Sequence, residues 1–217
     1  MAKYLTLALF TISLLSTLTI HAADCSRNIP GHYIDRFAKD SSGVIFNPSA
    51  RDSSGSVFDR LTGLTWMRCD ADLIWDINSQ QCIFNYNAQQ QIVRSPSNWQ
   101  EALLTTQEAN SNAALNYNDW RLPNIKELAS LQDLSCVSNG IGGYDIAIDK
   151  DVFLHPQASY WSSTPTRLKP GSTLKSGDTT ISPKAWKFTN KIIDFGADTA
   201  PITEKHYVRL VRGTSTN

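Results

Sequence analysis

A run of cations between residues 167 and 191 carries the clearest binding chemistry in this chain. Asp178 is the only acid within the run, and its basic members are Arg167, Lys169, Lys175, Lys184, Lys187 and Lys191. Lysine and arginine donate several charge-assisted hydrogen bonds, which is the chemistry that binds rows of sulfate groups. Trp186 lies among these cations, where an indole can stack on a sugar face or instead pack into the core. The six cations and Trp186 form the candidate ligand-binding site, with an ordinary solvated loop as the alternative.

Motifs for catalysis are missing from the sequence. It contains no GxSxG, no HExxH, no phosphate-binding glycine loop and no dinucleotide fingerprint. His155 and His206 have no nucleophile or carboxylate at a recognisable spacing, so we expect them to be structural or exposed. Asp119 and Arg121 flank Trp120, and we expect them to pair with each other. The sequence therefore predicts no catalytic residue and no cofactor.

The first 22 residues have the pattern of an export signal. Lys3 precedes an apolar run at 5–20, which ends in the small residues Ala22 and Ala23. Cleavage after Ala22 leaves 195 of the 217 residues, and no later segment approaches eighteen uninterrupted apolar residues, so we expect no membrane span after signal removal. Removing Lys3 from 20 basic and 20 acidic residues leaves a formal charge of about −1, which gives no field that attracts nucleic acid. We expect a protein of the periplasm, the cell surface or the medium.

Four cysteines remain in the exported chain, and an even number in an oxidising compartment indicates two disulfides. Four cysteines allow three connectivities. We favour Cys69 with Cys82, which closes a short loop with turn-forming residues inside it, and this leaves Cys25 with Cys136. A zinc site does not fit, because there is no CxxC pair and the mature histidines lie away from the cysteines in sequence.

The elements that must position these residues follow an N-terminal extension at 23–50. Residues 57–67 are apolar on both sides of Thr62 and Gly63 and predict a β-hairpin. Pro96 and Ser97 begin a helix, in which Ser97 and Gln100 have the spacing of a capping box. Its apolar stripe, expected to pack against a sheet, is Trp99, Ala102, Leu103, Thr106 and Ala109.

A second helix begins at Asn124, directly after Pro123, and the side chains of Asn124 and Glu127 have capping-box spacing. Strands are expected at 158–163, 185–188, 191–195 and 207–211, and long loops at 133–157 and 164–184. Early helices and later strands predict an α+β domain with one sizeable core. We expect four tryptophans in that core: Trp66, Trp99, Trp120 and Trp161. Trp75 and Trp186 lie where exposure and burial are equally expected.

Several separated segments combine into a family pattern. They are 62–69 (TGLTWMRC), 99–103 (WQEAL), 118–128 (NDWRLPNIKEL), 160–164 (YWSST) and 207–213 (YVRLVRG). In order and spacing they resemble the bacterial DUF1566 family, also called the Lcl C-terminal domain after a collagen-like adhesin. The resemblance covers about residues 51–213, which we expect to form one domain.

The resemblance implies a C-type-lectin-like fold, related to that of formylglycine-generating enzymes, in which two helices flank a small twisted antiparallel sheet with long loops and disulfides. It also implies surface adhesion through sulfated glycosaminoglycans. An oxidase is not favoured, because the expected bridges leave no spare cysteine pair. We therefore expect a carbohydrate-binding domain whose partner is an anionic glycan. The alternative is a structural or tip component of a pilus-like surface appendage that binds a surface protein through the same loops.

Overall fold

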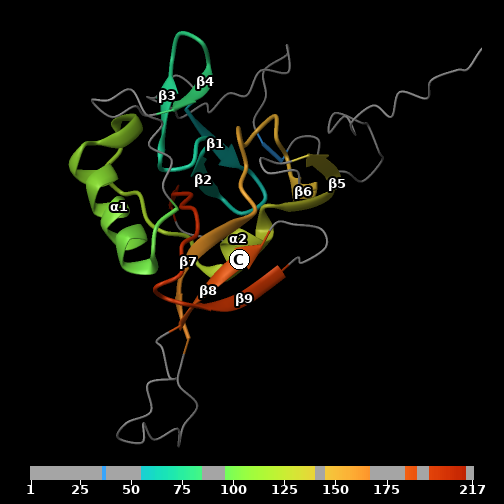
Figure 1. Ribbon diagram of the computed structural model, residues 1–217. Coiled ribbons are helices and arrows are strands. Elements are labelled where there is room, and N and C mark those ends of the chain that lie inside the picture. Colours follow the sequence, from blue (N-terminus) through green and yellow to red (C-terminus); the bar gives the residue numbers. More distant parts are fainter. Residues whose placement is uncertain are drawn as a thin grey trace, which may run out of the picture.

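The computed structural model describes residues 36–37, 55–84, 96–139, 145–166, 184–189 and 196–213, with the backbone alone for 134–139. Within these ranges lie four small antiparallel sheets and two α-helices (Figure 1). The α+β class predicted from the sequence is confirmed at this level. The export signal at 1–22, most of the extension at 23–50 and the strand predicted at 191–195 lie outside the described residues.

The elements follow one another along the chain as β1 (Ser56–Asp59), β2 (Leu64–Met67), β3 (Leu73–Asp76), β4 (Gln81–Phe84), α1 (Trp99–Ser111), η1 (Ala114–Asn116), α2 (Ile125–Ser130), β5 (Gln132–Asn139), β6 (Asp145–Ile148), β7 (Ser159–Pro165), β8 (Lys184–Thr189), β9 (Gly196–Pro201) and β10 (Val211–Arg212). The sheets have the strand orders β1-β2-β10, β3-β4, β5-β6 and β7-β8-β9. Figure 1 shows the β3–β4 hairpin at one end of the molecule, the β7–β8–β9 sheet at the other and α1 along one side. Helix α2 packs against β7 and β8.

The hairpin predicted at 57–67 is confirmed as β1 and β2. Gly63 has a φ of 72°, which glycine adopts without steric cost, and its N–H donates to the carbonyl of Asp59 at 2.9 Å. The buried carboxylate of Asp59 accepts from the N–H of Leu61 at 3.0 Å and from the hydroxyl of Thr62 at 2.8 Å. Arg36 pairs with the same carboxylate. One buried carboxylate therefore fixes this turn.

Both helices begin with a capping box, one of them a residue later than expected. The box at Asn124 and Glu127 is confirmed at the start of α2. The box at Ser97 and Gln100 is wrong, because α1 is capped by Asn98 and Glu101. The backbone of Ser97 is instead held in an extended bridge to residue 206, so its neighbour Asn98 takes the cap position. The stripe predicted on α1 also fails at one position, since Leu103 is 37% exposed.

Strands were underpredicted in the sequence. The loop expected at 133–157 contains most of β5 and all of β6, and the disulfide loop forms the β3–β4 hairpin. The strand expected at 207–211 is reduced to β10, while β9 was not predicted. Irregular pairing explains why β5 was not predicted. The register of β5 with β6 shifts between Gln132 and Val137, and this interrupts the alternation of apolar and polar residues that marks a strand.

The core accommodates the four tryptophans predicted to enter it, three completely and one in part. Trp66, Trp120 and Trp161 are at most 2% exposed, and Trp99 packs half-buried against the same cluster as Trp120 and Trp161. The indole nitrogens of Trp99, Trp120 and Trp161 donate to backbone carbonyls at 2.7–2.8 Å, whereas that of Trp66 has no acceptor among the described residues. Core packing is therefore the role of this set.

A fully buried guanidinium, that of Arg209, lies between the two main apolar clusters. It donates to the carboxylate of Asp70, to the hydroxyl of Tyr160 at 3.1 Å, and to the carbonyl oxygens of residues 67 and 68 at 3.0 and 2.7 Å. The ring of Phe153 lies 5.0 Å from it. Burial by itself lowers the pKa of Arg209, but Asp70 and then Tyr160 outweigh burial and the pKa is raised, so Arg209 stays charged. Burial also raises the pKa of Tyr160, whose protonated hydroxyl donates to Asp70.

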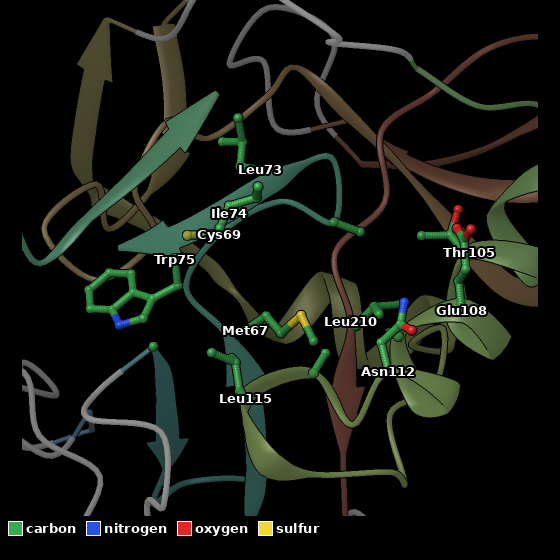
Figure 2. Close-up of a pocket in the computed structure, with 14 residues that line it drawn as sticks. Met67, Cys69, Leu73, Ile74, Trp75, Thr105, Glu108, Asn112, Leu115 and Leu210 are labelled. Carbon is green, nitrogen blue, oxygen red and sulfur yellow. The ribbon is translucent and has the colours of Figure 1, made fainter. Parts of the chain in front are cut away.

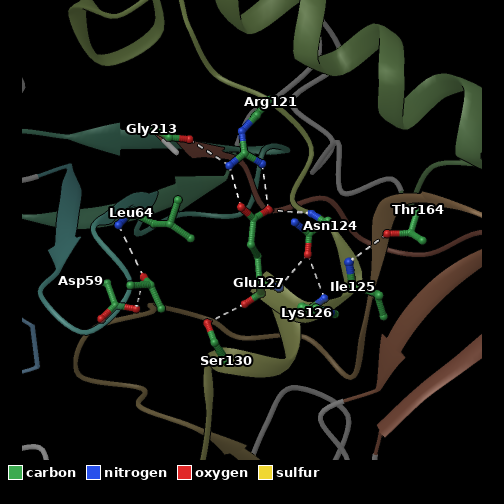
Figure 3. A network of polar contacts seen from close by, with 11 residues as sticks. Asp59, Leu64, Arg121, Asn124, Ile125, Lys126, Glu127, Ser130, Thr164 and Gly213 are labelled. Carbon is green, nitrogen blue, oxygen red and sulfur yellow. Dashed lines mark hydrogen bonds and ion pairs between the residues drawn. The ribbon is translucent and has the colours of Figure 1, made fainter. Parts of the chain in front are cut away.

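The segment at 118–128 forms a corner held by ion pairs (Figure 3). The carboxylate of Glu127 accepts two bonds from Arg121, at 2.6 and 2.8 Å, and a third from the N–H of Asn124 at 2.7 Å. Arg121 also donates to the carbonyl of Gly213 at 2.9 Å, which ties the C-terminal segment to α2. The predicted pair of Asp119 with Arg121 is therefore wrong. Asp119 instead accepts from Arg212 at 2.7 Å, because β10 lies beside this corner.

The disulfide between Cys69 and Cys82 is confirmed and joins the chain before β3 to β4. The second predicted bridge, Cys25 with Cys136, lies outside the described side chains. No helix in the described part of the chain is long and apolar enough to cross a membrane.

Candidate functional site

Three residues of the predicted site are described, and all three lie on β8: Lys184, Trp186 and Lys187. The other four, Arg167, Lys169, Lys175 and Lys191, lie outside the described residues. Because β8 is hydrogen-bonded to β7 on one side and to β9 on the other, its backbone is already paired. Only its side chains are available to a ligand.

Strand geometry divides these three side chains between two faces of the sheet. Successive side chains of a strand point to opposite faces, so Lys184 and Trp186 share one face and Lys187 lies on the other. Lys184 is exposed and Trp186 half-buried, and their partners on β9, Pro201 and Thr199, are half-buried too. The structure therefore brings one exposed ammonium and one accessible indole together. We call this pair, Lys184 and Trp186, the β8 face.

Lys187 contributes to a polar cluster on the opposite face. Its ammonium lies 3.6 Å from the carboxylate of Asp198 and 3.4 Å from the hydroxyl of Thr189, and only 15% of its side chain is exposed. An ammonium that is already paired and mostly covered binds an external anion less readily than the exposed ammonium of Lys184 does.

His206 belongs to the same polar cluster and packs edge-on against Trp161, with 4.6 Å between ring centroids. Its Nε2 lies 3.3 Å from the carboxylate of Glu204, and its Nδ1 lies 2.7 Å from the hydroxyl of Ser159. An ionised carboxylate only accepts, so in the neutral ring Nε2 carries the proton and Nδ1 accepts from Ser159. Burial, and then the charge of Lys187, lowers the pKa of His206. The expectation that this histidine is structural agrees with these contacts.

A pocket of about 400 Å³ opens between α1 and the β3–β4 hairpin, far in sequence from the predicted site. Figure 2 shows Leu73, Ile74 and Trp75 on the hairpin side and, opposite them, Thr105 and Glu108 of α1 and its C-cap Asn112, with Met67 and Leu210 between the two sides. The remaining lining residues are Gly55, Cys69, Ala71, Ala109, Ala114 and Leu115. The walls are mainly apolar, and the polar side chains of the lining come from α1 and its C-cap, Asn112.

Two features of the backbone around this pocket indicate a site with a defined shape. A Cβ at Gly55 would lie 2.6 Å from the side chain of Leu115 and 2.8 Å from that of Trp75, so these two side chains close on a bare backbone. Leu115 itself has a φ of 54°, and its neighbours Ala113 and Asn116 have φ values of 47° and 63°. Left-handed conformations are costly for alanine and leucine, and such strain often accompanies functional sites.

Comparison with known families decides the assignment of the chain. A family model described as the Lcl C-terminal domain matches residues 55–212. The chain belongs to the Lcl C-terminal domain family. This confirms the resemblance seen in the sequence and indicates a bacterial surface domain of the adhesin type. No curated protein sequence matches the chain.

The sequence does not predict the pocket of this Lcl C-terminal domain, although it contains Trp75 as a tryptophan for which exposure and burial are equally expected. The lining comes from β2, β3, α1, η1 and the segment before β10, so no short motif contains it. One signal was available: Thr105 and Glu108 of α1, and Asn112 directly after it, lie along one side next to the small residue Ala109. That pattern indicates a helix face that is not packed against large side chains.

Proposed function

We propose that this Lcl C-terminal domain binds anionic carbohydrate at the bacterial surface, with the β8 face as a contact. The single observation that supports the proposal most is the placement of Lys184 and Trp186 two residues apart on the same accessible side of one strand. An indole can stack on the apolar face of a sugar ring while a neighbouring ammonium binds a sulfate or carboxylate of the same chain. Family membership supports a surface role of this kind.

The proposal is one of binding and not of catalysis. The polar cluster on the opposite face of the sheet has a serine, a histidine and a glutamate in contact, but the serine hydroxyl serves as a donor to a half-buried ring that packs on Trp161. We further propose the C-type-lectin-like organisation implied by the resemblance, with Cys25 and Cys136 as a second bridge.

Retention on immobilised heparin tests the β8 face. Lys184→Ala and Trp186→Ala should each elute at lower salt than the unchanged protein. Lys184→Ala should lower the affinity about two- to fivefold, as expected for loss of one exposed charge contact. Lys205→Ala is the matched control, because it removes one exposed lysine outside the strand. Lys187→Ala should have a smaller effect than Lys184→Ala, since Lys187 lies on the other face and is paired with Asp198.

A column of desulfated heparin separates sulfate recognition from general adsorption, and high salt should abolish retention because it screens surface charge. Equal retention of Lys184→Ala, Trp186→Ala and the Lys205→Ala control would contradict the assignment of this face. Equal retention on desulfated heparin, which keeps its carboxylates, would contradict the recognition of sulfate.

A further inference from the structure

The pocket between α1 and the β3–β4 hairpin has the size and lining of a specific binding site. Its volume of about 400 Å³ falls within the range of sites that hold a small ligand or a large side chain. Met67, Leu73, Ile74, Leu115 and Leu210 give it apolar walls. Such a lining favours an apolar group, because burying apolar surface there is favourable and sugar hydroxyls would find few partners.

Among the described residues, the exposed charge at the pocket is negative. A cation beside it, Arg68, is buried, with its guanidinium 4.9 Å from the centroid of the Trp75 ring. Among the described residues of the lining, Glu108 is the only ionisable side chain apart from the disulfide-bonded cysteine, and it is exposed. The elements that form the walls add Asp76 and Glu101 and contain no lysine or arginine: β3 and β4 have none, and neither does α1. Hydrogen bonds from Ser79 and then Asn78 lower the pKa of Asp76, so this half-buried side chain carries a charge. An apolar group that carries or adjoins a positive charge complements these walls, whereas a polyanion does not.

The apolar surface continues beyond the pocket on the hairpin. Ile74 and Ile83 are directly paired across β3 and β4 and are 48% and 42% exposed, and Ile77 in the connecting turn is 52% exposed. Ile74 also lines the pocket, so this exposed apolar surface adjoins it, and contiguous exposed apolar patches mark protein interaction sites. The area next to the pocket therefore favours a polypeptide over a free small molecule.

We propose that this pocket docks a segment of a partner protein that inserts one large apolar side chain beside a lysine or arginine. The apolar side chain fills the space between Trp75 and Thr105, and the basic residue lies near Glu108. Rigid walls prepare the site for binding. The disulfide between Cys69 and Cys82 fixes the hairpin wall, and the α1 wall is fixed where the side chain of Asn110 bonds the backbone of Trp120 twice, at 2.7 and 2.8 Å.

Three short blocked peptides test this proposal by nuclear magnetic resonance on the whole protein: acetyl-Lys-Phe-Lys-amide, acetyl-Lys-Ala-Lys-amide and acetyl-Glu-Phe-Glu-amide. The indole N–H of Trp75 is the reporter, because it is buried and has no hydrogen-bond acceptor among the described residues. We expect Lys-Phe-Lys to shift the signals of Trp75, Thr105 and Asn112. The other two peptides should shift them at least several-fold less at the same concentration, because one lacks the apolar group and the other has the wrong charge.

Two variants of α1 locate the binding. Thr105→Phe places a ring in the pocket and should abolish the shifts caused by Lys-Phe-Lys. Gln107→Phe adds the same ring to the solvent side of the same helix and should leave the shifts unchanged, which controls for helix propensity and added apolar surface. Glu108→Gln should weaken binding about two- to fivefold, as expected for one exposed charge pair.

The outcomes are distinct from those of the heparin experiment, since Thr105→Phe should leave heparin retention unaltered. Equal shifts with Glu-Phe-Glu would overturn the charge assignment, and unchanged binding in Thr105→Phe would overturn the location. Binding of p-cresol as strong as that of Lys-Phe-Lys would assign the pocket to a small aromatic ligand and overturn the polypeptide partner. Absence of any shift with all three peptides would overturn the proposal as a whole.

Discussion

Replacement of Asp70 by asparagine should destabilise the domain more than any change at a surface ion pair. Asp70 and Arg209 are both fully buried, and the carboxylate accepts from Arg209 and from the hydroxyl of Tyr160 at 2.9 Å. An asparagine at this position would keep the shape of the side chain but remove the negative charge. The guanidinium of Arg209 would then remain as a buried cation with neutral acceptors alone near it, apart from the more distant Asp72.

The size of the effect follows from burial. Removing one partner of a buried ion pair typically costs about 3–5 kcal/mol, because the desolvated partner is left without compensation. For a domain of this size each kcal/mol lowers the melting temperature by roughly 2–4 °C, so Asp70→Asn should lower it by about 6–20 °C. Much of this loss is the penalty on Arg209 and not the net contribution of the pair, since replacing both partners by apolar residues can be far less costly.

Urea unfolding at pH 7, followed by tryptophan fluorescence, measures the change, and Asp119→Asn is the matched control. Asp119 also pairs with an arginine, Arg212, but its side chain is 50% exposed, so that variant should lose no more than about 1 kcal/mol. If Asp70→Asn does not fold, Tyr160→Phe keeps the ion pair and should cost about 1–3 kcal/mol through lost hydrogen bonds. Losses of equal size in Asp70→Asn and Asp119→Asn would refute the reasoning from burial.

Two further predictions concern His206 and the corner at 118–128. Because the pKa of His206 is lowered from its ordinary value of about 6.5, the unfolded chain binds more protons below that pH, and the free energy of unfolding should fall as the pH drops below about 6.5. His206→Gln should reduce this dependence of the free energy of unfolding on pH, measured by urea unfolding. Lys187→Met should raise the pKa of His206 in an NMR titration. A pKa of His206 above 6.5 in the unchanged protein would contradict burial and the charge of Lys187 as the dominant influences. Arg121→Lys should cost about 1–2 kcal/mol in thermal unfolding, because lysine cannot reproduce the two parallel bonds to the buried carboxylate of Glu127. Arg212→Lys, at a more exposed pair, is its control, and equal melting temperatures for the two variants would argue against the bidentate geometry as the cause.

Local chemistry was readable from the sequence, and pairing across the fold was not. The hairpin at 57–67, the capping box of Asn124 and Glu127 and the bridge between Cys69 and Cys82 each depend on residues close together in the chain, and all three were predicted. Arg121 was matched with its sequence neighbour Asp119, yet its partner is set by the path of α2 and the approach of the C-terminal segment. The same holds for α1, where the cap lies one residue later than predicted because an isolated bridge to the distant His206 fixes Ser97.

The candidate site shows the same division. Composition identified Lys184, Trp186 and Lys187 as neighbours on a basic strand, but only the pairing of β8 with β9 shows that Lys187 faces Asp198 and lies on the other side from Trp186. The pocket could not be predicted, because its walls come from elements on both sides of a long intervening segment. Arg209 was likewise missed as a core residue, since an arginine between valine and leucine in a terminal strand pattern gives no sign that its guanidinium is buried.

Charge makes the β8 face and the pocket suited to different ligands. A sulfated chain that reaches Lys184 meets a cation with an accessible indole beside it, whereas the same chain at the pocket meets Glu108 on a helix that has no lysine or arginine. At physiological ionic strength charge effects decay over about 8 Å, so each surface responds to its own side chains and not to the net charge of the chain, which is near zero. The two proposals are therefore independent. An adhesin domain of this family can bind a polyanion at the β8 face, at one end of its fold, while a basic, apolar segment of a protein occupies the pocket at the other end. Competition between heparin and the Lys-Phe-Lys peptide for the same sites would show that this separation by charge is wrong.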